Sequence, residues 1–118
     1  MKEIWKPIDN YENLYEVSNF GRVKSYHYHN GTYSRILKPR KVKDGYLMIA
    51  LYKDKKCKNF QVHQLVANAF IPNIKRYTEV NHKNFDKTDN NVTNLEWITR
   101  RENVLHYFRN VNKERRLA

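Results

Sequence analysis

The segment from Glu79 to Val104, EVNHKNFDKTDNNVTNLEWITRRENV, gathers six asparagines around a single histidine, His82. Asparagine favours neither helices nor strands, so local structure gives little reason to collect it. An imidazole can take a proton from water near neutral pH. Amide carbonyl oxygens are among the oxygen ligands that Mg²⁺ prefers. Together these residue types suit hydrolysis of a phosphodiester bond, in which a divalent cation stabilises the developing negative charge.

A strand–loop–strand–helix order is predicted for this segment. Residues 79–82 and 95–99 are predicted as short strands, and residues 83–93, which are polar and rich in turn formers, as a loop. The helix that follows is expected to begin at a capping box formed by Thr99 and Glu102.

Four side chains of this unit are expected to meet. Asn81 and His82 end the first strand, Asn94 lies just before the second, and Asn103 lies in the first turns of the helix, beside its apolar face. A hairpin packed on that helix brings the four together. Two amides can then offer oxygens to a metal, and a third can fix the tautomer of the imidazole.

The preceding residues are predicted to form short strands and then one helix. Alternation and turn residues indicate strands at residues 14–18, 22–28, 35–42, 45–53 and 59–62. Turns are expected at Asn19–Gly21, and at Asn30 and Gly31, which form the strongest hairpin dipeptide. The period then changes to that of an amphipathic helix ended by Pro72, with apolar residues at Val62, Leu65, Val66, Ala69 and Phe70.

The last helix is predicted to carry an apolar stripe of its own. The stripe consists of Val104, Tyr107, Phe108 and Val111, and the charged residues 112–118 are expected to fray. Strands followed by a helix, a hairpin and a final helix make the fold class α+β.

The charge of the chain favours an anionic partner. The net charge is +11, of which residues 35–61 carry +7 and residues 100–118 carry +4. A basic run of this density is either a solvated face or a surface that follows DNA phosphates, and the interleaved tyrosines favour the second. The first candidates for phosphate contacts are Lys38, Arg40, Lys41 and Lys43, followed by Arg100 and Arg101 at the start of the last helix.

Composition excludes several classes of protein. The single cysteine, Cys57, leaves no internal disulfide partner and does not suit a structural zinc site. No apolar run suits a membrane span, and the N-terminus lacks a signal-peptide pattern. We therefore expect a soluble cytoplasmic protein.

Two stretches resemble a known family. VHQLVANAFIPN at residues 62–73, followed by the asparagine-rich segment, resembles the HNH endonucleases of the homing and phage type, which have a ββα-metal fold. Residues 3–26, EIWKPIDNYENLYEVSNFGRVKSY, resemble the N-terminal motif that commonly accompanies this nuclease. The likeness covers residues 3 to about 107. It implies a DNA endonuclease that uses one Mg²⁺ (or Mn²⁺) for each active site and acts in a bacterial host cell, with a phage as one source of the gene.

The resemblance also implies roles for individual residues. His82 corresponds to the general base, and Asn81, where many relatives have Asp, to one metal ligand. Asn103 corresponds to the second ligand, and Asn94 to the residue that braces the loop and orients the histidine. His63 matches a histidine often present ahead of the helix, and its role is left open between structural, DNA-facing and catalytic.

The expected organisation is a single domain in three parts. Residues 1–61 form a β-rich DNA-binding part, residues 62–110 the nuclease part and residues 111–118 a basic tail. The partner is double-stranded DNA, bound by a monomer or weak dimer that nicks one strand or cuts both. Two alternatives are a catalytically degenerate DNA-binding regulator and an RNA-binding protein. The loop residues Asp86, Asp89, Asn90 and Asn91 are interpreted mainly as turn formers.

Overall fold

A computed structural model describes residues 1–28 and 33–117 of the chain. The turn predicted at Asn30 and Gly31 lies outside the described residues. The described part extends over about 55 × 31 × 31 Å.

The N-terminal half forms two antiparallel sheets. The first has the order β1 (Trp5–Pro7), β2 (Tyr15–Ser18), β3 (Val23–Tyr28) and β4 (Tyr33–Ile36). The second has the order β5 (Arg40–Lys41), β6 (Leu47–Lys53) and β7 (Lys56–Gln61). The strand predicted over residues 35–42 is wrong in one respect, because β4 and β5 belong to different sheets. Pro39 lies between them, and proline has no N–H to offer a continuous ladder.

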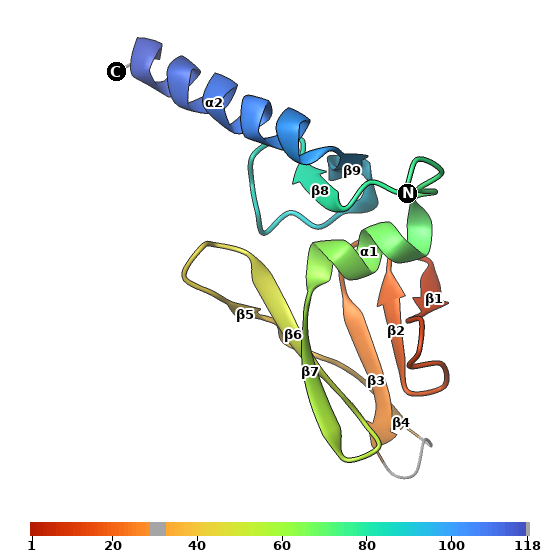
Figure 1. The fold of residues 1–118 in the computed structure, drawn as a ribbon. Helices are drawn as coiled ribbons and strands as arrows, with labels where there is room; N and C mark the ends of the chain where they lie inside the picture. The colour runs from red at the N-terminus through yellow and green to blue at the C-terminus, as the bar shows by residue number, and fades with distance from the viewer. Residues whose placement is uncertain (29–32, 118) are drawn as a thin grey trace.

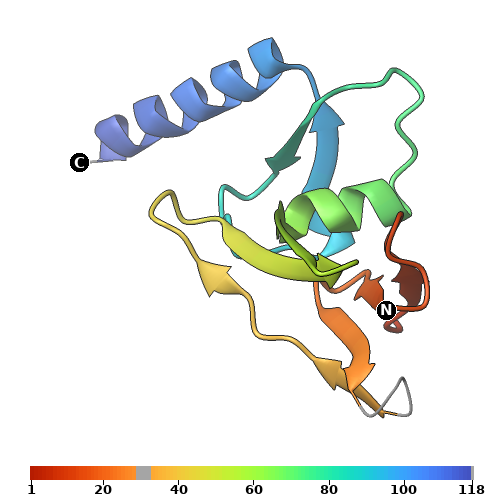
Figure 2. The same ribbon diagram turned by 60° about the horizontal axis from the view of Figure 1, so that its bottom comes forward.

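Helix α1 (Val62–Phe70) follows β7 directly and joins the two halves of the molecule. It ends at Ile71, whose backbone is extended as expected for a residue before Pro72. Its predicted apolar face is buried at Val62, Leu65 and Val66. In Figures 1 and 2, α1 lies between the N-terminal sheets and the hairpin of β8 (Glu79–His82) and β9 (Leu95–Ile98).

The C-terminal unit has the predicted strand–loop–strand–helix order. A short 3₁₀ turn, η2 (Val92–Asn94), leads into β9, and α2 (Arg100–Leu117) follows. The capping box is present, because the Glu102 N–H donates to Thr99 Oγ1 at 3.1 Å and the Thr99 N–H donates to Glu102 Oε2 at 3.5 Å. The capping box fixes the residue at which α2 begins, and therefore the position of Asn103 along β8.

One hydrophobic core connects these elements. Its buried members come from both N-terminal sheets, from α1 and from the β8–β9 hairpin: Ile8, Tyr15, Val17, Val23, Ile49, Leu51, Val62, Leu65, Val66, Ala67, Val80 and Leu95. The hairpin that carries His82 is therefore packed, through α1, on the same apolar interior as the sheets.

Helix α2 departs from the prediction in two respects. Its apolar stripe is not buried against the described part of the chain, because Val104, Tyr107 and Phe108 are 44%, 61% and 54% exposed. The helix also continues to Leu117, although residues 112–118 were expected to fray. In Figure 1, α2 extends away from the rest of the fold. None of the described helices has the length and apolar character needed to cross a membrane.

Candidate active site

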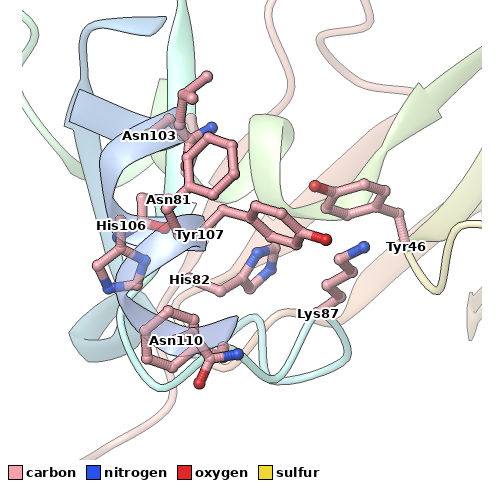
Figure 3. Close-up of a pocket in the computed structure, with 12 residues that line it drawn as sticks. Tyr46, Asn81, His82, Lys87, Asn103, His106, Tyr107 and Asn110 are labelled. Carbon is pink, nitrogen blue, oxygen red and sulfur yellow. The ribbon is translucent and has the colours of Figure 1, made fainter. Parts of the chain in front are cut away.

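A cavity of about 410 Å³ lies between β8, the loop that follows it and α2. Figure 3 shows Asn81, His82 and Asn103 along it, together with Tyr46 and Lys87. The loop also contacts the helix, because the rings of Phe85 and His106 stack with their centroids 4.0 Å apart. Three of the four side chains expected to meet, Asn81, His82 and Asn103, line this cavity; Asn94 is not among its lining residues.

His82 is buried at the end of β8, and one of its ring nitrogens is held. Its Nε2 lies 2.8 Å from Oδ1 of Asn90. An amide oxygen only accepts hydrogen bonds, so Nε2 carries the hydrogen and Nδ1 keeps the lone pair. Burial lowers the pKa of His82 below its ordinary value, while the hydrogen bond to Asn90 and the nearby carboxylates Asp86 and Asp89 act in the opposite direction.

Asn90 is the candidate site residue that the sequence interpretation missed. It was assigned to turn formation, and Asn94 was expected to orient the imidazole. Asn90 is instead the side chain that contacts His82, and it is 4% exposed. Five of the six asparagines of this segment follow His82 in the chain. No pattern in the sequence distinguishes Asn90 from the other four.

Asn94 braces the loop, as the other half of its expected role requires. Its Nδ2 donates to Asn84 Oδ1 and to the carbonyl oxygen of Asp89, each at 2.9 Å. Its Oδ1 accepts from the Asn84 N–H at 3.0 Å, and its backbone oxygen accepts from the Lys83 N–H at 2.8 Å. Asn94 therefore closes the base of the loop, and its hydrogen bonds go to Lys83, Asn84 and Asp89 and not to His82.

Asn81 and Asn103 each have their NH₂ group held by a carboxylate. Nδ2 of Asn81 donates to Glu96 at 2.9 Å, across the β8–β9 pair, and Nδ2 of Asn103 donates to Glu79 at 3.3 Å. Within the described ranges neither Oδ1 has a hydrogen-bond partner, so both oxygens remain available as ligands. The same ranges contain no cluster of three or more His, Cys, Asp or Glu suited to a metal. The two candidate ligands at this cavity are neutral amide oxygens, which fit a hard cation that also retains water ligands.

His63, at the start of α1, lies directly behind the candidate base. Its ring centroid is 4.8 Å from that of His82 and 5.1 Å from that of Tyr46. The residue is 3% exposed, and it is not among the residues that line the cavity. Burial lowers the pKa of His63 to about 4, and the neighbouring His82 contributes in the same direction. Near neutral pH His63 is therefore an uncharged ring that packs against His82 and Tyr46.

Lys87 connects the loop to the N-terminal half. Its Nζ donates to the carbonyl oxygen of Asp44 at 2.7 Å and lies over the Tyr46 ring, 4.6 Å from the centroid. The sequence places Lys87 in a mixed-charge loop and gives no signal for this contact. The contact brings the β5–β6 connection to the rim of the cavity.

The six basic residues proposed to contact phosphates are all exposed, and none of them lines the cavity: Lys38, Arg40, Lys41, Lys43, Arg100 and Arg101. The first four lie on or beside β5, next to the connection that Lys87 holds. The last two occupy the first turn of α2, on the other side of the site.

A buried histidine at the end of the first strand, a polar loop and a helix that faces it with an amide define a ββα nuclease unit. Two family models agree with this architecture. Residues 60–105 match the HNH endonuclease model, and residues 3–52 match the NUMOD4 motif. The chain belongs to the HNH homing endonuclease family, as its resemblance implied.

Individual relatives support the same placement. The chain is 41% identical to the DNA endonuclease I-HmuI of Bacillus phage SP01 over 97% of its own length and 65% of that protein. It is 36% identical to an uncharacterized HNH endonuclease of Acanthamoeba polyphaga mimivirus, over 91% of the chain and 31% of that protein. The solved structure of I-HmuI, described as showing DNA binding and cleavage, matches with a TM-score of 0.80 and 39% identity over 98% of this chain and 66% of that one. The chain thus spans about two thirds or less of the length of these relatives.

Proposed function

We propose that this protein is a divalent-metal-dependent DNA endonuclease that hydrolyses phosphodiester bonds. The observation that carries the proposal is the cavity in which His82 lies beside the available oxygens of Asn81 and Asn103. The family and the phage relative, whose name describes a DNA endonuclease, support double-stranded DNA as the substrate and a bacterial cell as the place of action.

His82 is the proposed general base. Its Nε2–H is held by Asn90, so the Nδ1 lone pair takes a proton from a water as that water attacks phosphorus. The bond from phosphorus to the leaving 3′ oxygen then breaks. Asn94 contributes by closing the loop that carries Asn90, and His63 supports the imidazole from behind.

Asn81 and Asn103 are the proposed metal ligands, with Mg²⁺ or Mn²⁺ as the ion. When bound, the cation supplies positive charge that stabilises the phosphate and the leaving oxygen. The hydrogen bonds from the two NH₂ groups to Glu96 and Glu79 keep each Oδ1 turned away from its carboxylate.

The exposed basic residues are proposed to follow the DNA backbone. The residues Lys38, Arg40, Lys41 and Lys43 extend this surface over the second sheet, and Arg100 and Arg101 flank the cavity at α2. In this arrangement residues 1–61 act mainly in DNA binding, residues 62–110 carry the chemistry, and residues 111–118 add a basic tail.

The test is conversion of supercoiled plasmid to nicked or linear DNA by the purified chain in Mg²⁺, Mn²⁺ or EDTA. His82→Ala is expected to reduce the rate by ~100-fold or more, because general-base catalysis contributes about that much. Its DNA affinity, measured by a shift assay in the presence of EDTA, should remain that of the wild-type protein. Asn68→Ala, at an exposed position of α1 outside the cavity lining, is the control for handling and folding. Wild-type cleavage by His82→Ala would refute the assignment of the base.

A non-catalytic DNA-binding module is the second candidate. It is favoured by the neutral donor set, because two amides attract a cation less strongly than a pair that includes a carboxylate. The same plasmid assay separates the two. Salt-sensitive binding without cleavage in any divalent metal would favour the binding module.

A further inference from the structure

A turn of the N-terminal motif makes an unusually close contact with the loop between β8 and β9 that carries Asn90. Gly21, in the turn between β2 and β3, has φ +87°. A Cβ added there would lie 2.8 Å from Cβ of Asn90 and 2.9 Å from its carbonyl oxygen. The two segments are also joined by a hydrogen bond, in which the Val92 N–H donates to the carbonyl oxygen of Asn19 at 2.9 Å. Only glycine allows the backbones to approach this closely.

The residue that this turn touches is the one that holds the imidazole. Asn90 Oδ1 accepts from His82 Nε2, while Asn90 Nδ2 is buried and has no partner in the described part of the chain. The Asn90 amide is therefore not fixed by a hydrogen-bond network of its own, in contrast to Asn94. Its position depends on packing, and the turn at Gly21 is the surface against which its Cβ and backbone lie.

We infer that Gly21 is a positioning residue for His82 and acts through Asn90. The NUMOD4 motif then contributes to the geometry of the active site in addition to any role in DNA binding. The catalytic part of this inference rests on the proposed function. The orientation of the imidazole does not, and it can be measured in protein without metal or DNA.

Gly45 offers a matched control. It also lies in the NUMOD4 motif and has a positive φ of +92°, so an alanine is strained to a similar degree at both positions. A Cβ at Gly45 meets only Cδ of Lys87, at 3.3 Å, which is part of a flexible side chain. Gly21→Ala and Gly45→Ala therefore share the backbone strain and differ in the contact with Asn90.

The first experiment measures the His82 tautomer in the metal-free chain. Long-range ¹H–¹⁵N spectra of histidine-labelled protein report which ring nitrogen carries the hydrogen, and His82→Gln assigns the signals. We expect a single Nε2–H tautomer in the wild type and in Gly45→Ala, and a mixture of tautomers in Gly21→Ala and Asn90→Ala. An unchanged Nε2–H tautomer in folded Gly21→Ala would overturn the inference, whether or not the protein cleaves DNA.

The second experiment measures single-turnover cleavage at saturating enzyme. We expect Gly21→Ala to lower the rate constant by ~10-fold or more at unchanged DNA affinity, since small displacements of a catalytic group cost rate. Gly45→Ala should remain close to the wild type. Gly21→Ala should add no further loss to Asn90→Ala, because both act on the same contact. Full additivity of the two losses would show an independent effect of Gly21 and contradict the proposed route.

A second variant tests the same contact between the turn and the loop if Gly21→Ala does not fold. Val92→Pro removes the N–H that donates to Asn19. Proline suits the first residue of the 3₁₀ turn, and Asn91 before it is already extended, with φ −62° and ψ 137°. This variant is expected to loosen the loop and to mix the His82 tautomers. A wild-type tautomer and wild-type cleavage in folded Val92→Pro would count against the turn as a support for Asn90.

Discussion

Acid is expected to destabilise this protein through His63. The side chain is 3% exposed, and its Nδ1 is buried without a hydrogen-bond partner among the described residues. The folded protein therefore resists protonation of this ring, and burial holds its pKa at about 4. In the unfolded chain the same ring titrates near 6.5. Between these two values the unfolded state binds a proton that the folded state does not.

The size and the sign of the effect follow from this difference. Stability rises with pH wherever the unfolded state binds more protons, so the contribution of His63 is complete above pH 6.5 and is lost as the pH falls towards 4. Each pH unit within this window is worth about 1.4 kcal/mol. The full loss is therefore about 3 kcal/mol, a large part of the stability of a small domain.

The perturbation that isolates this effect is His63→Phe. Phenylalanine retains a ring against Tyr46 and His82 but cannot take up a proton. Unfolding by urea, followed by circular dichroism at pH 7, 6, 5 and 4.5, gives the free energy of unfolding of both proteins. Contributions of the carboxylates cancel in the difference between them.

The wild type should lose about 2–3 kcal/mol more than His63→Phe over this range. Parallel loss of stability in the two proteins would refute the reasoning. It would mean that the folded protein protonates His63 near its ordinary pKa, through access of water to the buried nitrogen.

Three further predictions concern the metal ligand, the cap and the basic surface. Asn81→Asp replaces the amide that donates to Glu96 with a second carboxylate. In EDTA this repulsion should lower the free energy of unfolding by about 1 kcal/mol. Added Mg²⁺ should restore the lost stability, and so should the second substitution Glu96→Gln. Thr99→Ala removes the cap of α2 and should cost about 1 kcal/mol in thermal unfolding, whereas Thr78→Ala, at an exposed site without such a bond, should change little. Replacing Lys41 and Lys43 with Gln should reduce the slope of log affinity against log salt by about 2, and the same charge change at Lys75 and Arg76 should leave the slope unchanged.

Features set by neighbours in the chain were predictable from the sequence. The face of α1 and the capping box at Thr99 each depend on residues a few positions apart, and the positions of β8 and β9 follow from the turn formers between them. Their hydrogen bonds and packing follow from periodicity and turn chemistry, so the pattern and the structure agree.

Features set by contacts between distant segments were not predictable in the same way. The loop offers several amides of identical chemistry, and which one reaches His82 depends on how Asn94 closes the loop and how closely Gly21 approaches it. The stripe on α2 shows a different limit. Periodicity reports that a helix is amphipathic, but it does not say what covers the apolar face, and Tyr107 remains largely exposed.

Contacts between distant segments also affect how well the amides of Asn81 and Asn103 can bind a cation. Neither Asn81 nor Asn103 carries charge, yet each donates its NH₂ group to a carboxylate. Such a hydrogen bond fixes the orientation of the amide and polarises it, which makes its oxygen a stronger metal ligand. The negative charge of the site thus lies behind the candidate ligands, on Glu96 and Glu79. Under the proposed function, a DNA phosphate that approached the cavity would meet neutral oxygens first, because neither Glu79 nor Glu96 is among the lining residues, and the added distance would reduce the repulsion.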